Sequence, residues 1–236
     1  MRTRFQQGLD ELKTKLLEMG GLAESVVEAA VEGYMRRDPA ACQIVFGRET
    51  IINQAERDID GIAVDLLAMQ QPMASDLRFI LAVLKINADL ERVGDQAVNI
   101  AQRSLDLMKG PPVEIPVDVP RMTTAVATMV RRALESFITA NSEVAEAVLK
   151  MDNVVDRMKD EAFVTLVRQM EKDPENIRFY LDALLVTRNL ERIADHATNI
   201  AEDVIFWVRG DDVRHGQGLA KAAERHDEGI EGHKSH

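Results

Sequence analysis

Two acidic residues four positions apart recur in this sequence, and their chemistry raises the first question about function. Glu91 and Asp95 form one pair, and Glu191 and Asp195 form another pair one hundred residues later. Residues four apart on an α-helix lie on one face, a turn from each other. Two carboxylates held this way repel each other, and their burial is costly unless a cation compensates. The spacing therefore calls for a positive partner, either a metal ion or a basic side chain.

Each pair lies within a longer stretch that the chain contains twice. The two copies read LERVGDQAVNIA at 90–101 and LERIADHATNIA at 190–201. Apolar residues recur every three or four positions around both copies, which is the pattern of a helix face that packs on a core. The same periodicity places the carboxylates in the middle of that face, and the repeat indicates two equivalent halves.

A second acidic pair with the same spacing precedes each copy by one predicted helix. These pairs are Glu56 with Asp60, and Asp152 with Asp156. In an antiparallel bundle they face the first pairs, so that each half brings four carboxylates together. A set of oxygen donors with no Cys and almost no His suits Mg, Mn, Ca or iron better than structural zinc. The predicted metal ligands are Glu56, Asp60, Glu91, Asp95, Asp152, Asp156, Glu191 and Asp195.

These carboxylates allow two other interpretations. The first is a salt-bridged or solvated helix surface, because five arginines lie nearby in the sequence: Arg57, Arg92, Arg157, Arg188 and Arg192. Four pairs at matching places in two repeats favour a cation site over this interpretation. The second is ferritin-type di-iron oxidase chemistry, which uses Glu-x-x-His motifs. The one nearby histidine, His196, stands five residues after Glu191, so the sequence does not support that chemistry.

The elements that position these residues are predicted to be long helices. Ala, Leu, Val, Met, Glu and Arg dominate the composition, and aromatic residues make up only 4%, which is typical of helical proteins. The predicted helices cover residues 4–37, 39–69, 75–108, 121–139, 143–170 and 175–209. The predicted fold is therefore all-α, with two tandem three-helix bundles related by an internal pseudo-twofold repeat.

Turn signals separate the predicted helices and divide the chain. Asp38-Pro39 and Asp173-Pro174 each combine an N-cap residue with a proline at the first helical position. The proline-rich stretch 110–120 predicts the boundary between a first bundle at 1–110 and a second at 118–209. Residues 210–236 are polar and predict a disordered tail with incidental histidines. These histidines are His215, His226, His233 and His236.

Charge and composition exclude several classes of protein. The net charge of −11 argues against direct binding to nucleic acid or to an anionic membrane, because both attract proteins through clusters of Lys and Arg. The single cysteine, Cys42, rules out a disulfide framework and fits a reducing cytosol. The sequence shows neither a signal-peptide core nor an apolar run long enough for a membrane span. A cytoplasmic protein is expected.

Other polar residues of the repeats are expected to have structural roles. Asn99 and Asn199 are predicted to hydrogen-bond neighbouring helices, and Arg78 and Arg178 to pair with acids across the bundle. The sequence shows no nucleophile–base constellation, P-loop or glycine-rich fingerprint, so the protein is not expected to be an enzyme.

Taken together, these motifs resemble the PhoU family, the accessory proteins of the high-affinity phosphate transport system. The resemblance rests on Gln71-Pro72-x-x-x-Asp76-Leu77-Arg78 and on the two copies at 90–101 and 190–201, and it covers residues 4–209. It implies two three-helix bundles whose Glu/Asp-x-x-x-Asp motifs hold metal ions, often several together. Carried over, the motifs fall on the eight carboxylates named above, and the metal remains open among iron, manganese, magnesium and zinc.

The resemblance also implies a role and partners. It implies a non-catalytic adaptor that joins a phosphate ABC transporter ATPase to a sensor histidine kinase and restrains the phosphate-starvation response. The protein would be a homodimer that reaches the membrane only through its partners. Gln102 stands where the second half has Glu202, so the two sites are expected to differ in charge. The alternative is a carboxylate-bridged metalloenzyme of the helical-bundle type.

Overall fold

The computed structural model describes residues 4–69, 72–110, 112–211 and 213. This part of the chain forms six α-helices and one 3-10 turn and contains no strand, which confirms the predicted all-α class. The elements are α1 (Arg4–Arg36), α2 (Pro39–Met69), α3 (Ala74–Leu107), α4 (Val119–Thr139), α5 (Ser142–Lys172), η1 (Pro174–Asn176) and α6 (Ile177–Arg209).

Short polar side chains set two of the predicted helix starts. The carboxylate of Asp38 accepts a hydrogen bond from the backbone N–H of Ala40 at 2.8 Å, before α2 begins at Pro39. The side chain of Asn141 accepts from Glu143 N and Val144 N and caps α5. Such caps satisfy N–H groups that have no partner within the helix.

The second Asp-Pro signal works differently from the prediction. Asp173 is the N-cap residue of a 3-10 turn rather than of α6. Its carboxylate accepts hydrogen bonds from the Asn176 side chain and the Tyr180 hydroxyl, at 2.8 and 2.9 Å. Pro174 begins a 3-10 turn, and α6 starts only at Ile177. Asp173 thus links the turn to the first turn of α6 through side chains.

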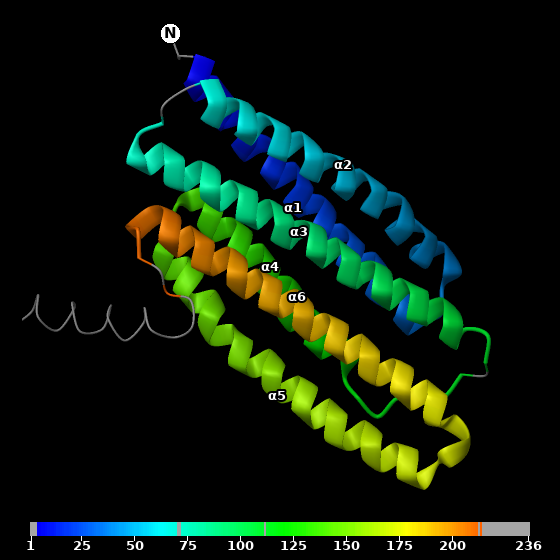
Figure 1. The fold of residues 1–236 in the computed structure, drawn as a ribbon. Helices are drawn as coiled ribbons and strands as arrows, with labels where there is room; N and C mark the ends of the chain where they lie inside the picture. The colour runs from blue at the N-terminus through cyan, green and yellow to red at the C-terminus, as the bar shows by residue number, and fades with distance from the viewer. Residues whose placement is uncertain (1–3, 70–71, 111, 212, 214–236) are drawn as a thin grey trace, which may run out of the picture.

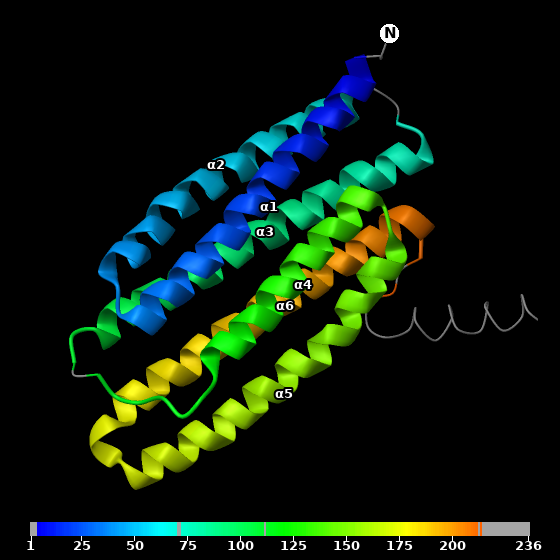
Figure 2. The ribbon, with the colours of Figure 1, turned by 180° about the vertical axis from the view of Figure 1, so that it is seen from behind.

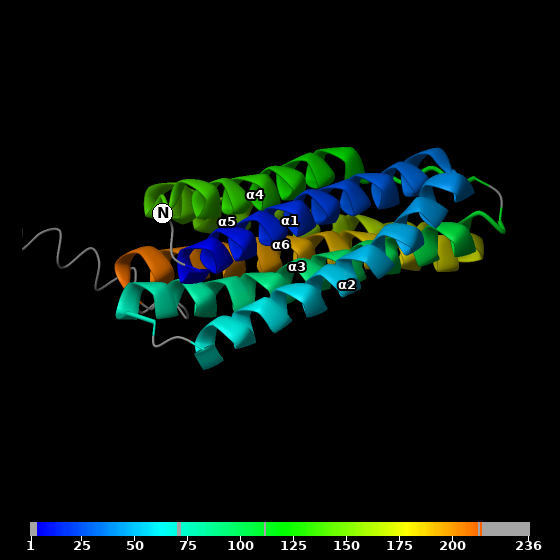
Figure 3. The same ribbon diagram turned by 90° about the horizontal axis from the view of Figure 1, so that it is seen from above.

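Helices α1–α3 form one antiparallel bundle, and α4–α6 form the other. Figure 1 shows α3 and α6 side by side in the middle, with α2 and α5 on the two outer edges. The view from behind brings α1 and α4 to the front (Figure 2). Seen from above, all the helices run along one long axis (Figure 3).

The two bundles share a hydrophobic core. One continuous cluster of buried side chains draws on all six helices, with α3 packed against α6 about as extensively as against α1. An aromatic group reinforces this junction: the ring centroids of Phe79 on α3, Phe137 on α4 and Trp207 on α6 lie 5.1–5.9 Å apart. The predicted division at residues 110 and 118 stays a prediction.

The arginines predicted to pair with acids have other positions. Arg78 Nε donates to the carbonyl of Trp207 at 3.3 Å and so binds the C-terminal turn of α6. Arg178 is exposed and forms no salt bridge within the described residues. The prediction was wrong for Arg78 because the end of α6 offers an unpaired carbonyl beside it.

Helix α6 ends at Gly210, whose φ of 77° is the left-handed conformation that favours glycine. The predicted tail and its four histidines lie almost entirely outside the described residues. No helix in the described segments is both long and apolar enough to cross a membrane.

Candidate functional site

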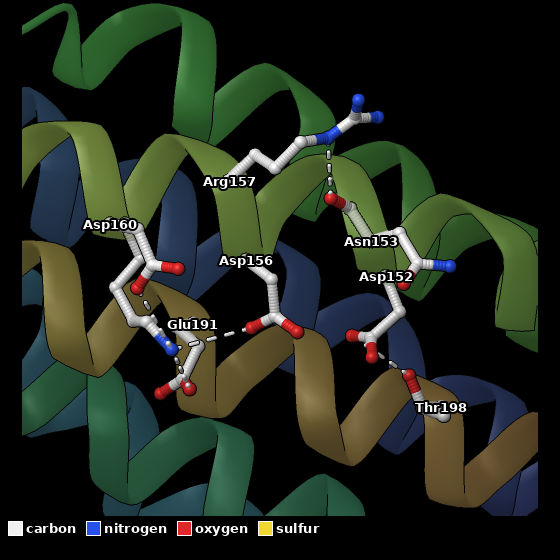
Figure 4. Close-up of polar contacts among 8 residues, drawn as sticks. Asp152, Asn153, Asp156, Arg157, Asp160, Glu191 and Thr198 are labelled. Carbon is white, nitrogen blue, oxygen red and sulfur yellow. Dashed lines mark hydrogen bonds and ion pairs between the residues drawn. The ribbon is translucent and has the colours of Figure 1, made fainter.

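The second half places its motif carboxylates along the seam between α5 and α6. Asp152 and Asp156 come from α5, while Glu191 and Asp195 come from the facing part of α6. Figure 4 shows Asp152, Asp156 and Glu191 in a row across this seam. Asp195 is exposed and the other three are half-buried, so the cluster lies at the surface of the bundle rather than in its interior.

A lysine, Lys159, lies among these carboxylates. Its Nζ is 3.0 Å from Glu191 Oε1, 3.4 Å from Asp156 Oδ1 and 3.8 Å from Asp160 Oδ1. Figure 4 shows the three acids, Asp156, Asp160 and Glu191, near one another. Hydrogen bonding to Glu191 raises the pKa of Lys159, because the carboxylates stabilise the charged ammonium. The second half therefore already contains a cation of its own.

Repulsion persists in the cluster in spite of this lysine. Burial, followed by the charges of Glu191 and Asp152, raises the pKa of Asp195 to about 6. Burial and the neighbouring Asp156 also raise the pKa of Asp152, whose carboxylate accepts a 3.4 Å hydrogen bond from the Thr198 hydroxyl. Both shifts show that removal from water and mutual repulsion outweigh the compensating contacts.

The first half repeats the arrangement between α2 and α3 with a different set of neighbours. Burial, then Asp95 and Glu56, raise the pKa of Glu91. Burial, then Glu49, raise the pKa of Asp95. Glu49 thus adds a fifth carboxylate that the motif spacing did not predict. None of Glu56, Asp60, Glu91 and Asp95 forms a salt bridge with Lys or Arg in the described part of the chain.

The amide of Asn87 on α3 links this helix to the part of α2 that carries Glu56 and Asp60. Its Nδ2 donates to Asp60 Oδ1 at 2.9 Å and to the backbone carbonyl of Glu56 at 3.0 Å. Its Oδ1 is buried and has no hydrogen-bond partner among the described residues. Asn87 is fully buried, and its two hydrogen bonds fix the position of α2 along α3 next to the carboxylates.

The two clusters differ at matched positions. Alignment of Glu56 and Asp60 with Asp152 and Asp156 places the buried Ala63 opposite Lys159. The same alignment places Glu49 opposite the buried Ala145. The first cluster therefore gains an acid and lacks the base, whereas the second gains the base and lacks the acid.

The salt-bridge interpretation from sequence was right about a basic partner in one half but wrong about its identity. Within the described residues, none of the five nearby arginines forms a salt bridge with any of the eight motif carboxylates. Arg92 lies 3.8 Å from Asp89, and Arg157 donates to the carbonyl of Asn153. The sequence does indicate the basic partner that the structure shows, because Lys159 stands three residues after Asp156 and hence on the same helix face.

A buried polar contact joins the two halves close to both clusters. Asp89 on α3 accepts hydrogen bonds from His196 Nδ1 at 2.9 Å and Asn199 Nδ2 at 3.2 Å, both on α6. Asp89 is 5% exposed, so this contact lies inside the α3–α6 junction. The predicted cross-helix role is confirmed for Asn199, while Asn99 makes no such bond among the described residues.

The fit of these residues to a metal ion differs between the halves. In the described chain, no three His, Cys, Asp or Glu side chains are arranged to hold a single ion. The first cluster nevertheless has the chemistry of a cation site. Its donors are hard oxygens, the pKa values of Glu91 and Asp95 are raised, and no described ammonium or guanidinium is in salt-bridge contact with the four motif carboxylates. The second cluster, as arranged, does not fit a metal ion, because the Lys159 ammonium stands among its oxygens.

Comparison with known proteins places this arrangement in a family. The family model described as "PhoU domain" matches residues 16–104 and again 119–204. A phosphate-specific transport system accessory protein PhoU homolog of Pseudomonas putida is 42% identical over 213 residues, covering 90% of this chain and 83% of that protein. The Pseudomonas aeruginosa homolog of the same name is 41% identical, covering 94% and 91%.

Solved structures agree with the sequence relatives. The crystal structure of PhoU from Pseudomonas aeruginosa matches with a TM-score of 0.85 at 40% identity, covering 88% of this chain and 100% of that one. The phosphate transport system regulatory protein PhoU from Streptococcus pneumoniae matches with a TM-score of 0.80 at 26% identity, covering 89% and 99%. This chain, with its two matched three-helix repeats, belongs to the PhoU family.

Proposed function

We propose that this protein is a non-catalytic, cytoplasmic regulator of phosphate uptake that restrains the phosphate-starvation response. The observation that carries the proposal is the match of both repeats to the PhoU domain, over most of the chain. Its relatives are named as accessory proteins of the phosphate-specific transport system. The proposed partners are the ATPase of a phosphate ABC transporter and a sensor histidine kinase, with the protein acting as a homodimer.

Exposed apolar side chains at matched positions support an adaptor role. Leu77 and Leu81 on α3 are each 38% exposed, and Ile177 and Leu181 on α6 are 45% and 46% exposed. Each pair stands one hundred residues from the other, so both repeats present the same apolar positions near the start of their third helix. The two side chains of each pair lie one helical turn apart and adjoin, and contiguous exposed apolar surface is a feature of protein-binding sites.

Metal binding at the carboxylate motifs is part of the proposal. At the first cluster, Glu56, Asp60, Glu91 and Asp95 would hold the ion through oxygen atoms, and Glu49 would add negative charge. The ion would supply positive charge that relieves repulsion and ties α2 to α3. The second set of motif residues belongs to the same proposal but includes Lys159, which must be displaced for a metal to bind.

A deletion strain tests the regulatory role. Deletion of this protein from its host is expected to leave phosphate-responsive genes active in phosphate-rich medium, and the intact chain is expected to restore repression. A reporter fused to such a gene provides the readout. Unchanged reporter activity in the deletion strain would contradict the proposal and make a carboxylate-bridged metalloenzyme the function to pursue.

Pull-down of the two proposed partners tests the adaptor surface. Leu81→Glu combined with Leu181→Glu is expected to weaken capture of the ATPase or the kinase, because it places charge on both matched apolar positions. Met35→Glu is the matched control, since Met35 is also exposed, at 47%, but lies on α1. Equal capture by the double variant and the control would exclude these leucines from the contact.

A further inference from the structure

The position of Lys159 has a consequence for how the two halves bind cations. Its ammonium contacts three carboxylates, those of Asp156, Asp160 and Glu191, at 3.0–3.8 Å. Its side chain is only 30% exposed, so the charge is partly withdrawn from water. We propose that Lys159 is a built-in counter-ion that takes the place of a divalent cation in the second carboxylate cluster, so that the two halves bind metal unequally.

The geometry explains why the ammonium competes with a metal ion. An ion bound between α5 and α6 would need oxygens of Asp156 and Glu191, and both already contact Lys159 Nζ. Divalent cations draw their affinity from negatively charged oxygen ligands. A metal ion at this point must break the lysine contacts and also accept a positive charge beside it. Both effects lower the affinity of the second cluster for metal.

The first half provides an internal comparison within the same chain. The position that matches Lys159 is Ala63, which is fully buried and carries no charge. Burial and acidic neighbours also raise the pKa values of Glu91 and Asp95 there. Among the described residues, one repeat thus presents carboxylates with no lysine or arginine in salt-bridge contact, and the other presents them already partly neutralised. For the first cluster, the inference rests on the proposed metal binding; for Lys159 it rests on the contacts above.

The test measures Mn²⁺ binding by the second cluster after the carboxylates of the first cluster have been neutralised. Glu91→Gln with Asp95→Asn removes the first cluster and leaves the second to be measured alone by titration calorimetry. In that background, Lys159→Met is expected to tighten Mn²⁺ binding at least tenfold. Lys150→Met, an exposed lysine on the same helix that forms no hydrogen bond or salt bridge among the described residues, is the control and should leave binding unchanged.

A thermal readout independent of affinity accompanies the titration. In EDTA, Lys159→Met is expected to lower the melting temperature, because Asp156 and Glu191 lose their cation, and added Mn²⁺ is expected to restore it. Circular dichroism confirms that the helices remain. Equal Mn²⁺ affinity with and without Lys159, or no Mn²⁺ binding by the Lys159→Met variant, would overturn the inference.

The same data separate this inference from the proposed metal site in the first half. Loss of Mn²⁺ binding when Glu91 and Asp95 are neutralised in an otherwise intact chain supports the first site. If that substitution changes nothing while Lys159→Met still creates tight binding, the proposed first site fails and the role of Lys159 stands. If the intact second cluster binds Mn²⁺ as tightly as the first, the inequality is wrong.

Discussion

Neutralisation of Asp195 is expected to stabilise the metal-free protein. Asp195 is the motif carboxylate with the largest pKa shift, to about 6, and the shift comes from burial and from Glu191 and Asp152. It forms no hydrogen bond or salt bridge among the described residues, so Asp195→Asn removes a repelled charge without breaking a contact. Asparagine has nearly the same shape, and the expected effect is therefore electrostatic.

The size of the effect follows from the pKa shift and from solvent screening. A shift from 3.8 to about 6 corresponds to roughly 3 kcal/mol of unfavourable charge at neutral pH, at about 1.4 kcal/mol per unit. Asp195 is exposed, and interactions between exposed charges are worth at most about 1 kcal/mol. We therefore expect Asp195→Asn to raise the free energy of unfolding by ~0.5–1 kcal/mol and the melting temperature by about 2 °C.

The pH dependence has a defined sign. Because the folded-state pKa of Asp195 lies above its unfolded value, the folded protein binds more protons between about pH 4 and pH 6. The wild-type protein therefore loses stability as the pH rises through this window. The advantage of Asp195→Asn is expected to be absent below about pH 4, to grow through the window, and to be constant above about pH 7.

Thermal unfolding in EDTA, followed by circular dichroism at several pH values, measures this difference. Asp65→Asn is the matched control, because Asp65 is exposed on α2 and makes no hydrogen bond or salt bridge among the described residues. Its melting temperature should follow the wild type throughout. A lower melting temperature for Asp195→Asn at about pH 8, or a gain that is the same at about pH 4 and pH 8, would refute the reasoning.

Three further substitutions test the fold around the site. Asn141→Ala removes the cap of α5 and is expected to cost about 1 kcal/mol in denaturant unfolding; an unchanged midpoint would exclude the cap. Phe137→Ala empties the aromatic junction of α3, α4 and α6 and is expected to cost about 3–5 kcal/mol; a loss under about 1 kcal/mol would mean that the bundles do not depend on this junction. Gly33→Ala brings a methyl group within 2.6 Å of Cys42 Sγ and 3.3 Å of its backbone nitrogen, so the melting temperature should fall; a rise would show that the α1–α2 turn can relax.

Local signals were sufficient to predict most of the helices. All six helices start and end within two residues of the predicted limits, because apolar periodicity and caps such as Asn141 act over a few residues. Asp173 is an N-cap residue as predicted, but of a 3-10 turn that precedes α6, and its carboxylate binds the side chains of Tyr180 and Asn176. That choice depends on where the first turn of α6 lies, which the Asp-Pro pair alone does not specify.

The pairing of α3 with α6 lay beyond the reach of the sequence patterns. Periodicity shows that a helix has a buried face, but it does not identify the helix that covers that face. The core joins the bundles through this pair, and Asp89 contacts His196 and Asn199 across it. The role of Asp89 in this junction was not predicted, because its partners on α6 lie more than one hundred residues away in the sequence.

The sequence by itself determined the repeat, the helical class and the eight carboxylates, because spacing along one helix decides which side chains share a face. Only the tertiary structure decided which charged side chains lie next to each carboxylate. Packing of α5 on α6 brings Lys159 to Asp156 and Glu191. Packing of α2 on α3 instead brings Glu49 near Asp95 and has the buried Ala63 at the position that matches Lys159. The charge balance of a cluster is a sum over two helices, so similar motifs give clusters of different charge.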